Sequence, residues 1–366
     1  MALPPPFVSG SDAALAAAGT LQTELTTRIN ASKFKAELSH LGIALVDLTS
    51  VGEDPDPSGS LSVQTAANAR WEAEVAVGSL SKIAIMFAAF RLRERVTVAA
   101  AGVAASASDV DDMVEKIVAD WKPIVSRKIA KSPFDFPDLK RICDFAASSP
   151  WKPQFKGSTK SWEQLDKFHE TSAATISGLP FMDRLRLAIR WSDNMASGSC
   201  VRDMGFQFLN GSLGEGGFAE NRRNGVLWLG GDFGFSARAP IMGAPPWDQA
   251  RNATWVRANA RGIASYLTLL WTNRLVDRDS SREMRDILVD RGVGYQTYMG
   301  IATPNVVRSW SKIGILTGSI SEGVIIETRS PKKAIIRYAA VGLSAVRTEA
   351  LEELASIFYE TVSALH

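Results

Sequence analysis

The sequence has few of the residues on which metalloenzymes and histidine-dependent hydrolases rely. It contains three histidines, His40, His169 and His366, and no two of them have the spacing of a metal-ligand pair. Protein zinc sites are built mainly from cysteine and histidine, and a Ser-His-Asp triad needs histidine as its base. We therefore expect neither a metal nor a cofactor, and any nucleophile here must use a base other than histidine.

Cysteine is equally scarce. With only Cys143 and Cys200, a disulfide framework is excluded, while one bridge or two buried free thiols both remain open.

Long apolar runs are absent, since none approaches the roughly 20 residues of a membrane span. The first residues also lack the basic segment and the apolar core of a signal peptide. The sequence thus predicts either a cytoplasmic protein or an exported one whose signal lies outside the sequence given.

An excess of charge of either sign is missing too. The 41 basic and 39 acidic residues are interspersed and leave a formal charge of +2, which gives no sign of a nucleic-acid or acidic-membrane partner. The 46% hydrophobic and 22% charged content is typical of a globular protein, and 366 residues suffice for one large domain or two modest ones. The oligomeric state is not indicated by the sequence.

The two ends of the chain carry the strand signals. Runs near residues 42–48, 310–317, 322–328 and 333–342 predict strands, and the short turns between the last three predict antiparallel pairing. Helical patterns near 11–36 and 348–365 predict a helix at each end.

The middle of the chain is mainly helical in pattern. Ile83 begins a segment that is apolar nearly all round, which indicates a buried helix, and 252–271 carries helical periodicity. The glycine-rich stretch 211–235 is predicted to be a loop. Because both chain ends contribute strands to one sheet, we expect a single interlocked unit over 1–366. In it, 1–78 and 300–366 form the sheet with its flanking helices, and 79–299 forms a mainly helical region with an insertion near 103–174.

Three short motifs carry the candidate chemistry. They are Ser79-Leu80-Ser81-Lys82 (S-x-x-K), Ser192-Asp193-Asn194 (S-D-N) and Lys312-Ile313-Gly314 (K-x-G). S-x-x-K occurs five times in the chain and S-D-N once. Context selects the match at Ser79, because it follows Gly78 at the point where a strand-rich segment gives way to the buried helix.

In this order the motifs resemble those of the serine β-lactamase and penicillin-binding-protein family, most closely the class A β-lactamase-like serine hydrolases. Residues 254–267 resemble the helix that follows the omega loop in that branch. The resemblance implies an α+β fold of the β-lactamase/transpeptidase type, with an antiparallel sheet, flanking terminal helices and an interlocked helical region.

The resemblance also implies a role for each motif residue. Ser79 is the nucleophile, and Lys82, on the same helix face three residues later, is its base once burial beside the cation of Lys312 has lowered its pKa. Ser192 relays a proton to the leaving group, and Asn194 holds Lys82 and the substrate amide.

The oxyanion hole is expected from the backbone N–H groups of Ser79 and of Ile315, which follows Gly314. The partner implied by these roles is a small-molecule or peptide-like acyl substrate.

Two departures from the family bear on the reaction. The stretch 235–247 contains no acid where class A enzymes have the glutamate that activates the deacylating water, although Asp232 and Asp248 flank it. Ile313 replaces the hydroxyl residue usual in the middle of K-x-G. The sequence therefore predicts a serine hydrolase that forms an acyl-enzyme with an amide, ester or β-lactam. β-Lactamase, peptidase, amidase and esterase all remain open, and the alternative is a catalytically weak penicillin-binding or scaffold protein.

Overall fold

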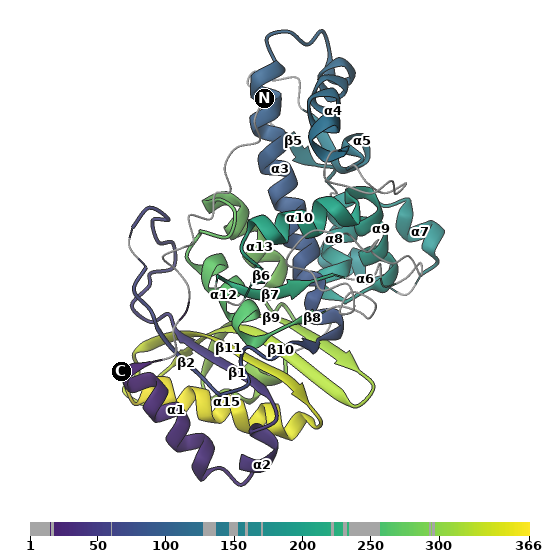
Figure 1. Cartoon of the computed structure of the whole chain (residues 1–366). Coiled ribbons are helices and arrows are strands. Elements are labelled where there is room, and N and C mark those ends of the chain that lie inside the picture. Colours follow the sequence, from purple (N-terminus) through teal and green to yellow (C-terminus); the bar gives the residue numbers. More distant parts are fainter. Residues whose placement is uncertain are drawn as a thin grey trace. The chain divides into compact units, whose positions relative to one another are not determined.

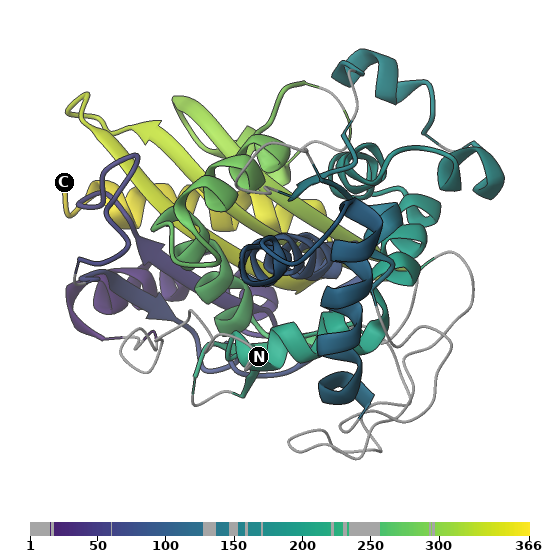
Figure 2. The same ribbon diagram turned by 90° about the horizontal axis from the view of Figure 1, so that it is seen from above.

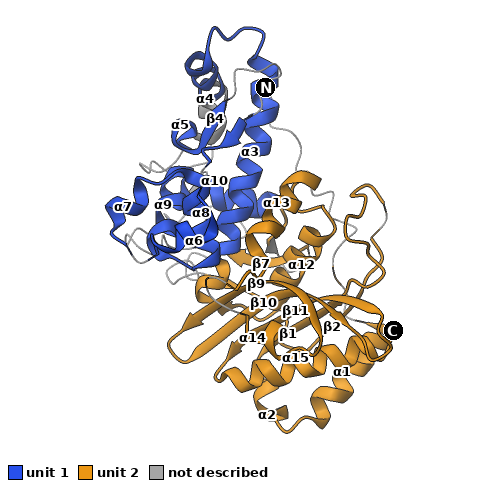
Figure 3. Ribbon diagram, turned by 180° about the vertical axis from the view of Figure 1, so that it is seen from behind, with its two compact units in different colours: residues 1–7, 82–215, 229–255 blue, residues 8–81, 216–228, 256–366 orange. Residues whose placement is uncertain are grey.

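The structure is a computed structural model that describes most of the chain. The described residues are 15, 18–59, 61–126, 137–145, 153–157, 160–169, 171–220, 223–229, 233, 257–292, 294 and 297–366. The chain divides into two compact units, each assembled from separate segments (Figure 3). Unit 1 comprises residues 1–7, 82–215 and 229–255, and unit 2 comprises residues 8–81, 216–228 and 256–366. The single interlocked unit expected from the sequence stays a prediction.

Unit 2 is built on a five-stranded sheet with the order β2-β1-β11-β10-β9, antiparallel throughout (Figure 1). Its strands are β1 (Gly42–Asp47), β2 (Gln64–Ala67), β9 (Val306–Leu316), β10 (Ser319–Arg329) and β11 (Ile335–Ala345). Four of them lie where the sequence predicts strands, and the α+β class is confirmed. The sequence does not predict β2, because its Gln-Thr-Ala-Ala has weak strand propensity and is held by distant segments, through the pairing with β1 and hydrogen bonds from the Gln22 side chain.

The terminal helices bury their apolar sides against one face of this sheet. They are α1 (Gly19–Ala31) and α15 (Thr348–Ser363), and both contribute leucines to the same hydrophobic cluster as the strands. The N-terminal helix is shorter than predicted, because the Ser32 hydroxyl accepts a hydrogen bond from the Phe34 N–H and ends it. A short helix, α2 (Lys35–Leu38), follows.

Helix α12 (Ala260–Trp271) packs on the opposite face of the sheet (Figure 1, Figure 2). A Cβ added at Gly323 of β10 would lie 2.5 Å from the Ile263 side chain, so this glycine lets the helix approach closely. The helix predicted over 252–271 is shorter in the structure. It begins at Ala260, since Asn259 caps it by accepting a hydrogen bond from the Gly262 N–H.

A second sheet in unit 2 has the order β3-β8-β7-β6. Its strands are β3 (Val75–Ala76), β8 (Arg257–Ala258), β7 (Gly225–Trp228) and β6 (Ala219–Glu220). The prediction of a loop over 211–235 is therefore wrong in part. Gly225, at a φ of 87°, is needed for close packing, because a Cβ there would lie 2.4 Å from the Gly262 nitrogen of α12.

Most described residues of unit 1 are helical. The helices are α3 (Ile83–Val103), α4 (Val110–Ser126), α5 (Leu139–Ile142), α6 (Trp162–Asp166), α7 (Ala173–Ser177), α8 (Phe181–Arg190), α9 (Asn194–Met204) and α10 (Phe206–Glu215). A small hairpin joins β4 (Cys143–Phe145) to β5 (Pro153–Phe155). The long apolar helix predicted after Ser79 is α3, which is buried along its first three turns.

Two further helices, α13 (Arg278–Leu288) and α14 (Tyr298–Ala302), complete unit 2. Within the described part of the chain, no helix combines the length and the apolar character that crossing a bilayer requires.

Candidate active site

The nucleophile candidate lies in a short 3₁₀ helix, Gly78–Lys82, that leads directly into α3. Gly78 has a φ of 52°, which glycine adopts at little cost, and the Ser81 hydroxyl donates to its carbonyl at 2.7 Å. Ser79 itself is half-buried. The turn therefore fixes the backbone around Ser79 and leaves part of its side chain accessible.

The glycine of K-x-G packs on this turn. A Cβ at Gly314 would lie 1.9 Å from the Val77 carbonyl oxygen and 2.6 Å from the Leu80 nitrogen, and only glycine allows that approach. On the other side, a Cβ at Gly78 would lie 3.0 Å from the Ile315 carbonyl oxygen. Two of the predicted motifs thus meet backbone to backbone inside unit 2.

Lys312 lies on β9 with its side chain buried at 3% exposure. Its Nζ donates a hydrogen bond to the Ile313 carbonyl at 3.0 Å, and the Ile313 side chain is also buried. Lys312 thus holds its buried amino group on the strand that borders the nucleophile turn, two residues from Gly314.

Lys82, Ser192 and Asn194 are brought together inside unit 1. The buried Lys82 ammonium donates to Asn194 Oδ1 at 2.7 Å and to the Ser192 carbonyl oxygen, and it lies 3.4 Å from Ser192 Oγ. Ser79 belongs to unit 2, so its hydrogen bond with Lys82 stays a prediction.

Asp193 has a structural role in the same turn. Its carboxylate accepts a hydrogen bond from the Ala196 N–H at 2.8 Å and so caps the N-terminus of α9. This capping places Asn194 in the first turn of α9 and leaves Ser192 between two helices.

Burial changes the acid–base properties of Lys82. Desolvation lowers its pKa from 10.5 to about 7, and the negative charge of Asp193 opposes that change. The further lowering expected from Lys312, which belongs to unit 2, stays a prediction. Near neutral pH, Lys82 is thus half deprotonated and can accept a proton.

This pKa predicts the pH dependence of acylation. The resemblance implies that Lys82 is the base, and in that role only the neutral amine is active, so the rate should rise with pH, reach half its maximum near pH 7 and level off above pH 8. Phosphonylation of Ser79 by a fluorophosphonate, which needs the same proton removal from the Ser79 hydroxyl, measures this dependence when followed from pH 5.5 to 10. A rate that keeps rising to pH 10 would mean that Lys82 titrates like an exposed lysine.

One residue near Lys82 is not predicted by the sequence. The Lys82 ammonium lies 4.8 Å from the centre of the Phe233 ring, and Phe233 has a φ of 58°. No local pattern pairs a phenylalanine with a lysine that is 151 positions away along the printed chain. Its neighbour Asp232, the stretch 235–247 and Asp248 lie outside the described residues.

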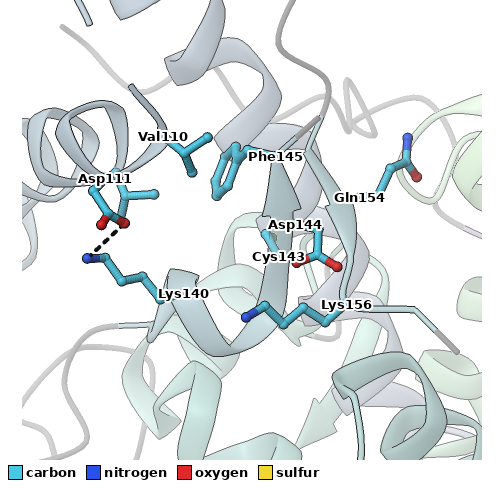
Figure 4. A pocket seen from close by; sticks show the side chains of 9 residues that line it. Val110, Asp111, Lys140, Cys143, Asp144, Phe145, Gln154 and Lys156 are labelled. Atoms are coloured by element: carbon cyan, nitrogen blue, oxygen red, sulfur yellow. Dashed lines mark ion pairs between the residues drawn. The ribbon is translucent and has the colours of Figure 1, made fainter. Parts of the chain in front are cut away.

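A cavity of about 550 Å³ elsewhere in unit 1 contains none of the motif residues (Figure 4). It is lined by Val110, Asp111, Val114, Lys140, Cys143, Asp144, Phe145, Gln154 and Lys156, with Asp111 and Lys140 forming an ion pair at 3.1 Å.

Both cysteines are buried free thiols, and burial raises each thiol pKa to about 12, so neither is a nucleophile at neutral pH. In the part of the chain that the structure describes, no cluster of three His, Cys, Asp or Glu could hold a metal.

Comparison with known proteins identifies the family. Among solved structures, a beta-lactamase from Sphaerobacter thermophilus is 15% identical, with a TM-score of 0.47 over 94% of this chain and 98% of its own. PBP-A is 14% identical, with a TM-score of 0.48 over 98% of both chains. A class A beta-lactamase from Mycobacterium abscessus is 13% identical, with a TM-score of 0.47 over 94% of this chain and 99% of its own. A search of curated protein sequences finds no match.

The decisive match is to a family model. Residues 159–362, more than half of the chain, match the model described as the beta-lactamase enzyme family. The matched range includes Ser192, Asn194 and Lys312 but begins after the Ser79 motif. The resemblance drawn from the motifs is thereby confirmed, and with it the general class of serine hydrolases. The chain belongs to the beta-lactamase enzyme family.

Proposed function

We propose that the chain is a serine hydrolase that forms an acyl-enzyme on Ser79, with Lys82 as the base. The observation that carries this proposal is the state of Lys82. It follows Ser79 within one short helix, is held by Ser192 and Asn194, and has a pKa of about 7. Burial of a lysine destabilises the fold, and a lysine whose pKa lies near 7 can accept and donate a proton at neutral pH.

The acylation step follows from these positions. Neutral Lys82 takes the proton of the Ser79 hydroxyl as Oγ attacks the carbonyl carbon of the substrate. The proton then passes through the Ser192 hydroxyl to the leaving nitrogen or oxygen, whose bond to the carbonyl carbon breaks. The product is an ester on Ser79, which water later hydrolyses.

The negative charge that forms on the substrate oxygen must be stabilised by hydrogen-bond donors. We assign them to the backbone N–H groups of Ser79 and Ile315, a pairing supported by the close approach of Gly314 to the nucleophile turn. Lys312 is assigned to an anionic group of the substrate, supported by its burial on the same strand.

Covalent trapping tests the proposal. The protein is incubated with a fluorophosphonate or with benzylpenicillin, and intact-mass measurement is followed by peptide mapping. We expect one adduct on Ser79 and none in Ser79→Ala. Ser81→Ala is the matched control, because that hydroxyl lies in the same helix but donates to the Gly78 carbonyl, so this variant should still be labelled.

The rival function is a catalytically weak binding or scaffold protein on the same fold. It predicts reversible binding of a penicillin without any change in mass. An unmodified protein that still binds a penicillin in calorimetry would favour this rival, and an adduct on a residue other than Ser79 would reject our assignment.

Turnover of ordinary penicillins should be slow or absent. General-base assistance to the deacylating water typically contributes about 10²–10⁴-fold, and the sequence offers no carboxylate in 235–247. Ile313 also removes a hydrogen bond to the substrate carboxylate, a loss of about 1 kcal/mol. With nitrocefin we expect a burst of at most one equivalent, followed by an adduct that lasts for many minutes.

Time-resolved intact mass after removal of excess nitrocefin measures this lifetime. Steady hydrolysis at ordinary β-lactamase rates, with no adduct accumulating, would contradict the prediction. Asp232, Asp248 or a more distant acid would then have to activate the water.

A further inference from the structure

Ser192 has a backbone conformation that its neighbours must maintain. Its φ is 57°, in the left-handed region, and it lies between Trp191, the C-cap of α8, and Asp193, the N-cap of α9. A non-glycine residue pays about 1–3 kcal/mol for such a conformation and keeps it only where the surroundings fix it. The carbonyl that this conformation orients is the one that accepts a hydrogen bond from Lys82.

One segment of unit 1, residues 160–169, contacts both neighbours of Ser192. On one side, the indole N–H of Trp191 donates to Asp166 Oδ1, and the Trp191 ring lies 5.7 Å from the ring of Trp162. On the other side, His169 Nδ1 is 3.8 Å from Asp193 Oδ2.

The segment is itself well anchored. Ser161 and Gln164 form a reciprocal capping box that fixes the start of α6. The guanidinium of Arg186, on α8, stacks over the Trp162 ring at 3.9 Å and donates to the Lys160 carbonyl at 3.0 Å. These contacts of residues 160–169, called the brace below, join α6 to α8 at Arg186, six residues before Ser192.

Of these contacts, the hydrogen bond between Trp191 and Asp166 depends on an exposed side chain, that of Asp166. Trp191 is 2% exposed, and a buried indole N–H needs an acceptor, which Asp166 provides from an exposed position. Removing that acceptor leaves the core intact and frees the indole to rotate.

We propose that Asp166 is a positioning residue which, by holding Trp191, keeps Ser192 in the conformation that binds Lys82. This inference rests on the proposed function, in which Lys82 is the base. If the turn relaxes, the Ser192 carbonyl moves away and water reaches the ammonium. Burial is what lowers the pKa of Lys82, so hydration raises that pKa toward its ordinary value.

The test compares Asp166→Ala with Asp166→Asn, which keeps an acceptor oxygen. Phosphonylation of Ser79 by a fluorophosphonate should be about tenfold to a hundredfold slower in Asp166→Ala, with the midpoint of its pH profile moved above 7. Asp166→Asn should retain most of the rate and the wild-type midpoint. Asp193 and His169, the other titratable groups at this turn, stay unchanged in both variants.

Trp191→Phe, which keeps a ring but lacks the indole N–H, should behave like Asp166→Ala. Its matched control is Trp271→Phe in unit 2, because the Trp271 indole nitrogen is buried without a hydrogen-bond partner among the described residues. That variant loses the same volume and should keep both the rate and the midpoint.

A second readout separates this inference from the proposed function. NMR titration of protein carrying ¹³Cε-labelled lysine, with the Lys82 signal assigned from Lys82→Met, follows the protonation of Lys82 without any substrate. An upward shift of that titration in Asp166→Ala supports the inference even if no acyl-enzyme forms. Identical Lys82 titrations in the wild type, Asp166→Ala and Trp191→Phe would overturn it.

Discussion

Lys82→Ala should slow acylation of Ser79 by about 10⁴-fold at pH 8, since removal of the base of an activated serine commonly costs that much. The residual rate should grow with hydroxide concentration and show no plateau near pH 7, because the proposed base has been removed. Stopped-flow or intact-mass kinetics with the fluorophosphonate measure both features.

The variant Lys82→Arg tests whether Lys82 acts as a base or through its positive charge. A guanidinium keeps the charge but is not deprotonated in proteins, so this variant should be as slow as Lys82→Ala. If Lys82→Arg acylates within tenfold of the wild type, Lys82 acts through its charge, and the proposed proton transfer is wrong.

Gly314→Ala should lower the free energy of unfolding by about 3 kcal/mol, because the new methyl group collides with the backbone and not with a side chain that can move aside. The two atoms in the way, the Val77 carbonyl oxygen and the Leu80 nitrogen, lie 1.9 and 2.6 Å from the ideal Cβ position. Any relaxation must displace the turn that carries Ser79, so acylation should also fall by about a hundredfold.

The control for this variant is Gly52→Ala, also in unit 2. Gly52 is exposed, and a Cβ there meets no atom within 4 Å, so stability and acylation should both stay close to those of the wild type. Chemical denaturation of the wild type, Gly314→Ala and Gly52→Ala measures the expected differences in stability. Equal unfolding midpoints for Gly314→Ala and the wild type would show that β9 does not pack so tightly on the turn.

The sequence predicts what depends on local pattern. The strands of the large sheet are visible because β-branched runs alternate with turn residues, as in the stretch 319–345. The family follows from three motifs in order, although each motif alone is a weak signal. The first turn of α3 is predictable as well, since apolar residues on every side of a helix indicate burial.

What the sequence does not predict depends on contacts between distant segments. Gly225 lies in a glycine-rich stretch and gives a loop signal, yet it belongs to a strand because α12 requires a residue without a side chain there. The pKa of Lys82 could be expected to fall, but its cause, burial under Ser192 and Asn194, becomes visible only when those residues are placed. Phe233 and the brace through Asp166 have no local signature at all.

The pairing of β1 with β11 determines how early the large sheet can be completed during synthesis. Gly42 pairs with Leu343, so the first strand of the sheet must wait until about 300 more residues have been synthesised. At the usual ribosomal speed of roughly 5–20 residues per second, the edge of β1 that pairs with β11 remains unpaired for tens of seconds, although the other edge can pair with β2 early. Pairings so far apart in sequence also fold slowly once the chain is complete. Expression at low temperature or with a holdase chaperone should therefore raise the yield of folded protein more than any stabilising substitution on the surface.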